Sequence, residues 1–183
     1  MPSSSRRLGA PLLVAALFLT LPLLWLVSRI PVPGFTRVEL EDAGSGRSLL
    51  VCLLSDGEQA TLAWTNSLFG LAVTEVFEAR GGRLVQTRVA FADPAGGEPP
   101  RARPEDLDDL YHTGGPFRVE GLARPLDRVV YRVGEIGNPV FRAAGQCLAL
   151  KPAVGFGGAV RLTARPGLLR DRLPRLASLR TGC

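Results

Sequence analysis

An uncharged, apolar run of twenty residues, Leu8 to Val27, follows Arg6 and Arg7 and constrains this chain more than any other feature. At a rise of about 1.5 Å per helical residue, a run of this length just crosses the roughly 30 Å hydrocarbon core of a bilayer. Basic residues beside an apolar span favour the cytoplasmic side. The sequence therefore predicts a single-pass protein of the cytoplasmic membrane, with its N-terminus inside and the rest of the chain on the extracytoplasmic side.

A cleaved signal peptide is the alternative to this anchor. The apolar part of a signal peptide usually spans about 7–15 residues and ends in a small-x-small cleavage site. Here the run is longer, and the residues from Leu26 to Pro31 contain no Ala-x-Ala pattern. We therefore favour an uncleaved membrane anchor over residues 1–29, which contacts the lipid bilayer through Leu8–Val27.

The formal net charge of +5 resides at the two ends of the chain. Residues 1–29 carry three Arg and no acid, and residues 165–183 carry five Arg and one Asp. Residues 30–164 carry 14 basic and 16 acidic side chains. A nucleic-acid-binding domain concentrates basic residues on its folded part. The charge distribution therefore argues against nucleic acid as a partner.

The chain divides into four segments. After the anchor, residues 30–34 contain two Pro, which favour a short extended connector. Residues 35–164 have the length of one extracytoplasmic domain with its own core. Residues 165–183 form a basic C-terminal tail, in which Leu residues alternate with Arg as in an amphipathic segment on anionic lipid. Pro174 argues against one continuous helix, and we favour a disordered tail.

Alternation with a period of two, typical of strands, dominates residues 35–164. The patterns at 73–79 and 83–91 flank Gly81-Gly82 and predict a hairpin. Residues 93–104 predict a loop, and Pro104–Tyr111 predicts one short helix. Further strands are expected at 37–41, 48–54, 61–65, 117–120, 128–133, 139–142, 147–151 and 159–163. About ten strands at this spacing predict an all-β domain, a single β-sandwich or open barrel, after one N-terminal transmembrane helix.

Three cysteines, Cys52, Cys147 and Cys183, are too few and too widely spaced for a zinc site. Cys52 and Cys147 both lie in strand patterns, and an exported location permits a disulfide between them. Equally, both could be buried small apolar residues, the more frequent fate of strand cysteines. The sequence shows no metal-ligand spacing and no cofactor-binding motif, so we expect neither a metal nor a cofactor.

Several short segments carry a resemblance through their order and spacing. They are Leu49-Leu50-Val51-Cys52-Leu53, Asn66-Ser67-Leu68, Leu71-Ala72-Val73-Thr74-Glu75, Ala95-Gly96-Gly97-Glu98-Pro99, Arg132-Val133-Gly134, Leu148-Ala149-Leu150 and Gly155–Val160. Together they resemble a bacterial domain-of-unknown-function family of small, membrane-anchored extracytoplasmic proteins, often encoded beside TAXI-type TRAP transporters. The match covers about residues 48–163.

The resemblance implies an extracytoplasmic accessory role, associated with a TRAP transporter component in solute uptake, and it supplies no reaction. It marks Asn66, Ser67, Glu75 and Gly97 as residues that bind a ligand or partner. Asn66 stands where the family has His, and it cannot act as a general base because an amide does not titrate near neutral pH. The sequence leaves the role of Asn66 open.

Glu75 shares a strand face with Val73 and Phe77 by the two-residue period. If this face points inward, the acid is buried and needs a partner. A structural ion pair is the simpler expectation. The alternative is an acid that binds a ligand, with Asn66 and Ser67 as its neighbours.

We expect no enzymatic activity. Ser67 lacks a Gly-x-Ser-x-Gly elbow, and the single His of the chain, His112, lies in a polar segment. An anchored hydrolase-like enzyme that uses Ser67 or Glu75 is the alternative, and a passive structural envelope protein is a third. An enzyme requires a cavity in which Glu75, Ser67 and Asn66 converge. A partner-binding module requires an exposed apolar or edge-strand patch.

Overall fold

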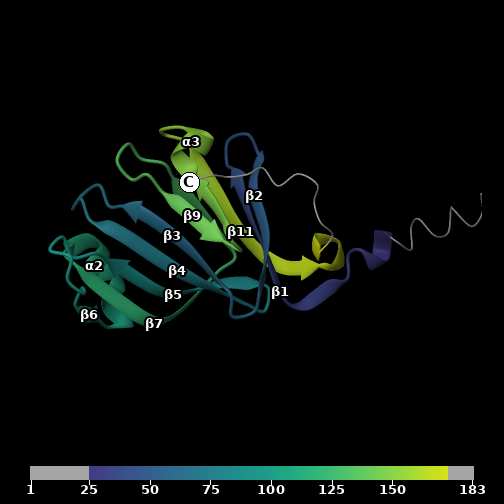
Figure 1. Ribbon diagram of the computed structural model, residues 1–183, viewed down its shortest axis with the longest axis horizontal. Helices are drawn as coiled ribbons and strands as arrows, with labels where there is room; N and C mark the ends of the chain where they lie inside the picture. Colours follow the sequence, from purple (N-terminus) through teal and green to yellow (C-terminus); the bar gives the residue numbers. More distant parts are fainter. Residues whose placement is uncertain (1–24, 173–183) are drawn as a thin grey trace, which may run out of the picture.

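The computed structural model describes residues 25–172, and every structural statement below refers to this part of the chain. It is mostly β, with two sheets that contribute to a common apolar core (Figure 1). The prediction of a mainly β domain is confirmed. Within residues 25–172 no helix is long and apolar enough to span a membrane. The predicted anchor at Leu8–Val27 lies almost entirely outside the described residues.

The smaller sheet has the strand order β2-β1-β11-β8, and all its neighbours are antiparallel. Its strands are β1 (Pro31–Asp42), β2 (Ser48–Ser55), β8 (Arg128–Arg132) and β11 (Ala159–Leu168). The larger sheet has the order β10-β9-β3-β4-β5-β7-β6, and its last pair, β7 and β6, is parallel. Its strands are β3 (Gln59–Thr65), β4 (Ala72–Arg80), β5 (Arg83–Phe91), β6 (Arg101–Ala102), β7 (Phe117–Leu126), β9 (Val140–Ala143) and β10 (Gln146–Ala149).

The first core cluster fills the space between the two sheets. Val38 and Leu40 of β1 and Leu54 of β2 enter it from the smaller sheet, and Phe77 of β4 and Phe141 of β9 enter it from the larger sheet. All five are buried. Alternate residues of each strand meet here because successive side chains point to opposite faces. Each such side chain contributes about 1.5–3 kcal/mol through removal of apolar surface from water.

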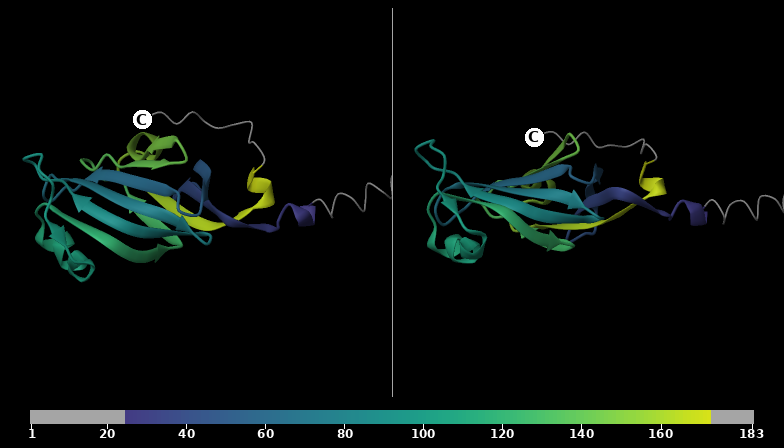
Figure 2. Two further views of the ribbon diagram at one scale, coloured as in Figure 1. Left: turned by 60° about the horizontal axis from the view of Figure 1, so that its bottom comes forward. Right: turned by 90° about the horizontal axis from the view of Figure 1, so that it is seen from below.

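The second core cluster lies under a short helical segment. The 3₁₀ turn η1 (Pro104–Asp106) runs directly into α2 (Leu107–Thr113), and Leu107 packs in one cluster with Phe91, Phe117 and Val119 of the larger sheet. The rings of Phe91 and Phe117 are stacked, with their centroids 4.5 Å apart. Figure 2 shows α2 and the smaller sheet over different parts of the larger sheet. The larger sheet therefore contributes to two apolar clusters, one covered by the smaller sheet and the other by α2.

The β4–β5 hairpin forms where the sequence predicts it. Gly81 and Gly82 both have positive φ angles, 56° and 83°, which glycine adopts without steric cost. A Cβ atom at Gly82 would lie 2.6 Å from Cγ of Pro166 on β11. The turn therefore needs glycine at this position for its backbone angle and for close packing against the smaller sheet.

Four elements differ from the predictions. β1 already begins at Pro31, so the expected connector is part of a strand. Its two prolines precede Phe35, the first residue that pairs with β2, so they remove no N–H group from the β1–β2 ladder. β11 continues to Leu168 and is followed by the 3₁₀ turn η2 (Leu169–Arg172), so the folded part passes the expected boundary at residue 164. The pattern at 147–151 divides between β10 and the short helix α3 (Leu150–Val154), and β6 lies in the expected loop.

The two ends of the described chain lie side by side. Pro31 is opposite Leu168 in the β1–β11 register, and the backbone N–H of Leu169 donates to the carbonyl of Ile30 at 3.0 Å. The guanidinium of Arg37 donates to the carboxylate of Asp171 at 2.8 Å, and both side chains are buried. Because of this ion pair, η2 is held against β1. The part of the basic tail beyond residue 172 lies outside the described residues.

The disulfide between Cys52 and Cys147, which the sequence left open, is not formed. Cys52 on β2 is a buried free thiol in the first core cluster, whereas Cys147 on β10 is disulfide-bonded. Burial raises the pKa of the Cys52 thiol to about 12. Cys52 thus behaves as a small apolar core residue, which was the other interpretation of its strand position.

Candidate functional site

β4 carries an acidic residue between the two core clusters. Val73 belongs to the second cluster and Phe77 to the first, and Glu75 lies between them in the sequence. The β3–β4 register is unbroken through this stretch, so the three side chains share the inward face. Glu75 is only 8% exposed. The interior therefore contains an acid at the point where the cover of the larger sheet changes from the smaller sheet to α2.

Two neutral side chains hydrogen-bond the carboxyl group of Glu75. The indole Nε1–H of Trp64 on β3 donates to Oε1 at 3.1 Å, and the amide Nε2–H of Gln86 on β5 donates to Oε2 at 2.7 Å. Trp64 lies opposite Val73, and Gln86 lies opposite Phe77, so both reach Glu75 diagonally from neighbouring strands. Trp64, Glu75 and Gln86 thus lie side by side across three neighbouring strands, and we call these three residues the polar layer.

An irregularity in β5 brings Gln86 into this layer. Val76 pairs with Arg88 while the next residue, Phe77, pairs with Gln86, so Thr87 is an extra residue on β5. A strand with strict alternation turns residues three positions apart to opposite faces. The bulge removes this conflict, and Gln86 and Val89 are both buried. The polar layer thus depends on one inserted residue.

No cation neutralises Glu75 within residues 25–172. None of the ion pairs of this part of the chain includes it, and both of its hydrogen-bond donors are uncharged. The expectation of a structural ion pair is therefore not met. Burial raises the pKa of the Glu75 carboxyl, and the hydrogen bonds from Trp64 and Gln86 oppose this rise. An acid held in this way is a candidate for binding or proton chemistry.

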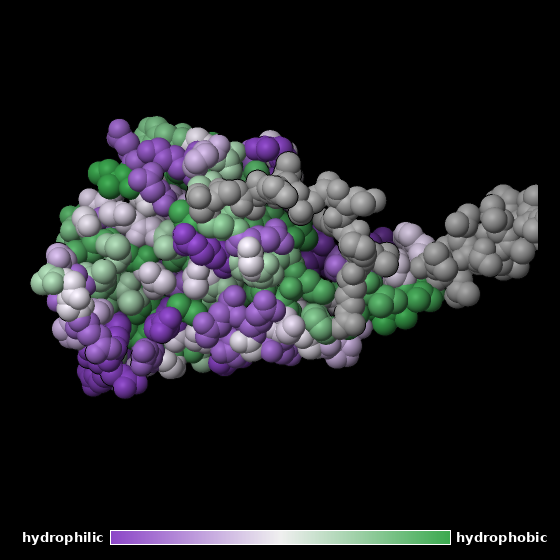
Figure 3. Space-filling model, in the orientation of Figure 1, coloured by the Kyte–Doolittle hydropathy of each residue, from purple (hydrophilic) through white to green (hydrophobic). Residues whose placement is uncertain are grey.

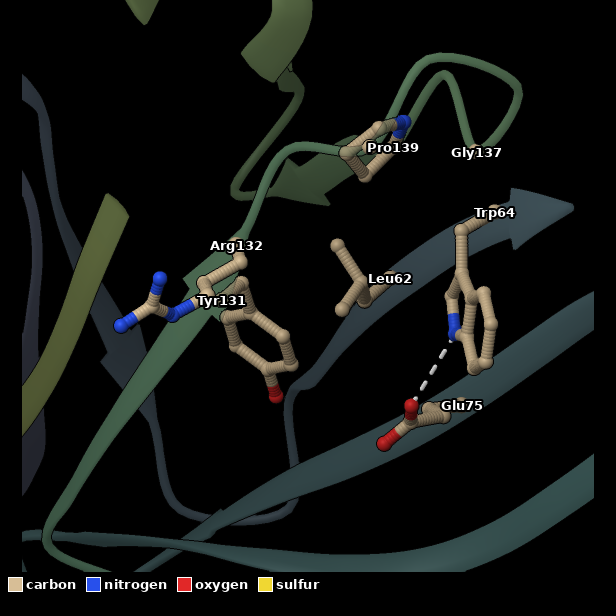
Figure 4. Close-up of a pocket in the computed structure, with 8 residues that line it drawn as sticks. Leu62, Trp64, Glu75, Tyr131, Arg132, Gly137 and Pro139 are labelled. Atoms are coloured by element: carbon tan, nitrogen blue, oxygen red, sulfur yellow. Dashed lines mark hydrogen bonds between the residues drawn. The ribbon is translucent and has the colours of Figure 1, made fainter. Parts of the chain in front are cut away.

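Trp64 and Glu75 of the polar layer border a cavity of about 220 Å³. The cavity reaches from the larger to the smaller sheet and is lined by Leu62, Trp64, Glu75, Tyr131, Arg132, Gly134, Gly137 and Pro139. Figure 4 shows the rings of Trp64 and Tyr131 on either side of Leu62, with Glu75 close to Trp64 and the guanidinium of Arg132 pointing away. The cavity wall is therefore aromatic and aliphatic around one carboxyl group.

Tyr131 brings a hydroxyl group from β8 to the cavity. Burial raises the pKa of Tyr131, and the negative charge of Glu75 raises it further. The hydroxyl therefore stays protonated at physiological pH and can donate a hydrogen bond to a ligand. Tyr111 on α2 has its pKa raised by the same two causes, so Glu75 lies within electrostatic reach of both covers of the sheet.

The connection between β8 and β9 forms the rim of the cavity. Its Gly137 accepts a hydrogen bond from the backbone N–H of Thr65 at 2.7 Å, and its Glu135 carbonyl accepts one from Nζ of Lys151 at 2.6 Å. Asn138 has a positive φ of 39°, in the region that Asn tolerates better than most residues. The rim is thus held to β3 on one side and to α3 on the other.

Asn66 and Ser67 lie outside this cavity. The side chain of Asn66 is buried, and its Oδ1 accepts hydrogen bonds from the backbone N–H groups of Leu68 and Phe69 at 2.9 and 3.1 Å. This is an Asx turn that shapes the β3–β4 connection. Ser67 is exposed in the same turn. The structure therefore does not bring Asn66 and Ser67 together with Glu75 as cavity-lining residues.

The remaining candidates are also separate from the cavity. Gly97 is exposed in the 93–100 loop, and a Cβ atom there would lie 3.0 Å from a carboxylate oxygen of Asp93. Nδ1 of His112 lies 2.7 Å from the carbonyl oxygen of Asp108, and no hydrogen bond joins His112 to Ser67. The described residues contain no group of three or more His, Cys, Asp or Glu side chains that could hold a metal ion.

Sequence reasoning missed Trp64, Gln86 and Tyr131. Trp64 and Tyr131 fall in strand patterns, where an aromatic residue is expected in a core. Strict alternation from Val89 places Gln86 on the opposite, polar face of β5. Only the bulge at Thr87 turns Gln86 inward. The available signal is a polar residue between buried Leu84 and Val89 on a strand that neighbours Glu75.

No protein-family model matches this chain, and no curated protein or solved structure is significantly similar to it. The resemblance to the transporter-associated family therefore stays a prediction from the sequence. The interpretation of the site rests on the contacts, burial and charges described above.

Proposed function

We propose that this chain is a membrane-anchored, extracytoplasmic β-sandwich protein that binds a small solute without transforming it, as an accessory to a solute-uptake system. The observation that carries the proposal is the cavity between the sheets, in which Trp64, Tyr131, Leu62 and Pro139 surround the buried carboxyl of Glu75. Mostly apolar walls with few, well-placed polar groups are typical of ligand-binding pockets.

The residues that line the cavity favour binding over catalysis. Among these eight residues, Glu75 is the one carboxylic acid, and none is Ser, Thr, Cys, His or Lys. Nucleophilic catalysis needs an activated nucleophile next to a base, and acid–base hydrolysis commonly uses two carboxyl groups. Ser67, the nucleophile of the alternative hydrolase hypothesis, is exposed in a turn away from this lining.

The surface near the start of the described chain supports attachment to a membrane. Large apolar side chains are exposed there, namely Trp25, Leu26, Val27, Ile30 and Leu169. The guanidinium of Arg29 lies 3.9 Å from the centroid of the Trp25 ring. Aromatic and basic residues of this kind favour the boundary between lipid and water. Figure 3 shows apolar residues, in green, along the narrow part of the molecule that leads to the N-terminal segment.

Association with a TRAP transporter component rests on the sequence resemblance. A domain with a solute pocket on the extracytoplasmic side, close to the membrane, suits capture or sensing of the solute before transport. Co-purification of the tagged chain with a TRAP permease from native membranes supports this part of the proposal. Recovery of the uncleaved chain in the cytosolic fraction would refute the anchored location.

Solute binding is tested on the full chain in lipid nanodiscs. A panel of small amines, carboxylic acids, amino acids and alcohols is screened by thermal unfolding and ligand-observed NMR. A solute present at 100 times its Kd stabilises the folded state by about 2.7 kcal/mol, which raises Tm by roughly 5–10 °C for a domain of this size.

A paired substitution shows whether such binding uses the cavity. Gly134 lines the cavity at an ordinary φ, and a Cβ atom there has no neighbour within 4 Å, so Gly134→Leu fills open space without a backbone clash. Val130 on β8 is 49% exposed and is not among the residues that line the cavity, so Val130→Leu provides the control. We expect Gly134→Leu to abolish the Tm shift and Val130→Leu to retain it. Equal binding by both variants, or no binding by any solute, refutes the proposal.

A further inference from the structure

We propose that the solute is a small organic cation, an amine or quaternary ammonium compound, that Glu75 pairs with between the rings of Trp64 and Tyr131. This inference rests on the proposed function and names the chemistry of the ligand. The observation behind it is a buried carboxyl group that borders an aromatic cavity and has no cationic partner in the part of the chain that the structure describes.

The hydrogen-bond pattern of Glu75 suits an ionised carboxylate. Each oxygen accepts one bond from a donor, Oε1 from the indole of Trp64 and Oε2 from the amide of Gln86. An ionised carboxylate accepts at both oxygens and has capacity for about four hydrogen bonds, whereas a protonated carboxyl uses part of that capacity to carry its proton. The polar layer therefore leaves acceptor capacity for a further donor from the cavity.

Without a ligand, no positive charge from the described residues neutralises a negative charge on Glu75. Burial of an unpaired carboxylate is costly, and an opposite charge within the same low-dielectric space offsets the cost. Arg132, the one basic residue that lines the cavity, is exposed, and Figure 4 shows its guanidinium turned away from Glu75. A cationic ligand supplies the missing charge, while an anionic ligand adds repulsion.

The cavity walls suit an organic cation better than a metal ion. Trp64 and Tyr131 present aromatic rings, which attract cations through their quadrupoles, and quaternary ammonium ligands are recognised in this way. The edge-to-face contact of Trp64 with Phe91, with centroids 6.3 Å apart, fixes the orientation of the indole. Leu62 and Pro139 offer apolar contact for alkyl groups. A bare metal ion requires several oxygen or nitrogen ligands, and the lining supplies one carboxylate.

The size of the cavity restricts the ligand further. Pockets for drug-sized molecules have volumes of about 300–1,000 Å³. At about 220 Å³ this cavity is smaller. We therefore expect compounds of the size of tetramethylammonium, choline or butylammonium, and we expect longer alkyl chains to bind more weakly.

The test compares two probes of the same shape and different charge. Choline and its uncharged isostere 3,3-dimethylbutan-1-ol are titrated into the full chain in nanodiscs of uncharged lipid, with binding measured by calorimetry and ligand-observed NMR. We expect choline to bind about tenfold or more tightly than the isostere, as a contribution of about 1.4 kcal/mol from charge gives a factor of ten. Equal affinities overturn the inference but leave the proposed function standing. If neither probe binds while other solutes of the panel do, the inference of a cationic ligand fails and the proposed solute binding stands. If no solute binds, the inference and the proposed function both fail.

A matched pair of variants assigns the charge preference to Glu75. Glu75→Gln keeps the size and removes the charge, and Glu78→Gln does the same on β4 at a residue that pairs with Arg80. We expect Glu75→Gln to bind choline and the isostere with equal affinity and Glu78→Gln to behave as the unmodified chain. Retention of the choline preference in Glu75→Gln overturns the inference.

A pH titration of the unmodified chain covers the case in which Glu75→Gln does not fold. The groups near Glu75 are Tyr131 of β8 and Tyr111 of α2, both with raised pKa values, and Arg132. The Glu75 carboxyl is the one acid of the cavity lining, and burial raises its pKa, so its protonation removes the negative charge of the cavity as the pH falls. We expect the affinity for choline to fall as the pH decreases through the raised pKa of Glu75, and the affinity for the isostere to stay constant. A choline affinity independent of pH overturns the inference.

Discussion

The buried ion pair between Arg37 of β1 and Asp171 of η2 provides a sharp test of the fold. Its charged atoms are 2.8 Å apart, and the two side chains are 6% and 4% exposed. Removal of one partner from a buried pair costs about 3–5 kcal/mol. Glu39 also contacts Arg37, at 2.9 Å, and retains part of the compensation. For Asp171→Asn we therefore expect a loss at or just below the lower end of this range, about 2–3 kcal/mol in the free energy of unfolding.

This loss corresponds to a decrease in Tm of roughly 4–12 °C for a domain of about 150 residues. The measurement is thermal and urea unfolding of the full chain, followed by tryptophan fluorescence. The control is Asp127→Asn, which removes a pair with Arg83 whose side chains are 67% and 60% exposed. Exposed pairs contribute at most about 1 kcal/mol. If Asp171→Asn and Asp127→Asn lower the stability equally, the packing of η2 against β1 is refuted.

Three further predictions concern buried polar groups. Trp64→Phe removes the indole N–H that donates to Glu75. We expect a loss of about 1–2 kcal/mol in the free energy of unfolding, measured by urea unfolding, and a further rise of the Glu75 pKa, measured by NMR of the side-chain carboxyl. An unchanged Glu75 pKa contradicts this prediction. Because burial raises the pKa of Glu75, its contribution to stability is complete below the unfolded pKa of about 4.3 and is lost as the pH rises through the folded pKa. The stability of the chain relative to Glu75→Gln therefore decreases from acidic to neutral pH, and an opposite slope in urea unfolding disproves the burial of the charge. The Cys52 thiol has a pKa near 12 and is only 6% exposed, so we expect it to resist iodoacetamide in the native chain at pH 8 and to react after unfolding. Rapid alkylation of Cys52 in the native chain, located by mass spectrometry, argues against its core position.

Alternation along the sequence predicts most strands because the longer elements follow it over most of their length, on either side of irregularities such as the bulge in β5. The hairpin at Gly81-Gly82 and the helix after residue 104 follow from local signals that act within a few residues. The assignment of each strand to a sheet does not follow, because β1 pairs with β11 across more than a hundred residues of chain. The layering of α2 and the smaller sheet over one large sheet depends on such long-range pairings.

The candidate site is harder to predict than the fold. The inward position of Glu75 follows from its spacing to Val73 and Phe77, but its partners depend on features that alternation hides. Gln86 reaches the acid through the extra residue Thr87, and Tyr131 comes from the other sheet. Asn66 looks like a binding residue because of the resemblance, yet local backbone donors occupy its side-chain oxygen.

The pairing of Pro31 with Leu168 determines how the domain responds to mechanical load. β1 starts and β11 ends at the same end of an antiparallel pair, so traction between residues 30 and 169 breaks inter-strand bonds one after another. Such a geometry unzips at lower force than one in which many bonds are sheared at once. The Arg37–Asp171 ion pair joins β1 to the segment after β11 at this same end, so it opposes the separation of the two strands together with the bond between Leu169 and Ile30.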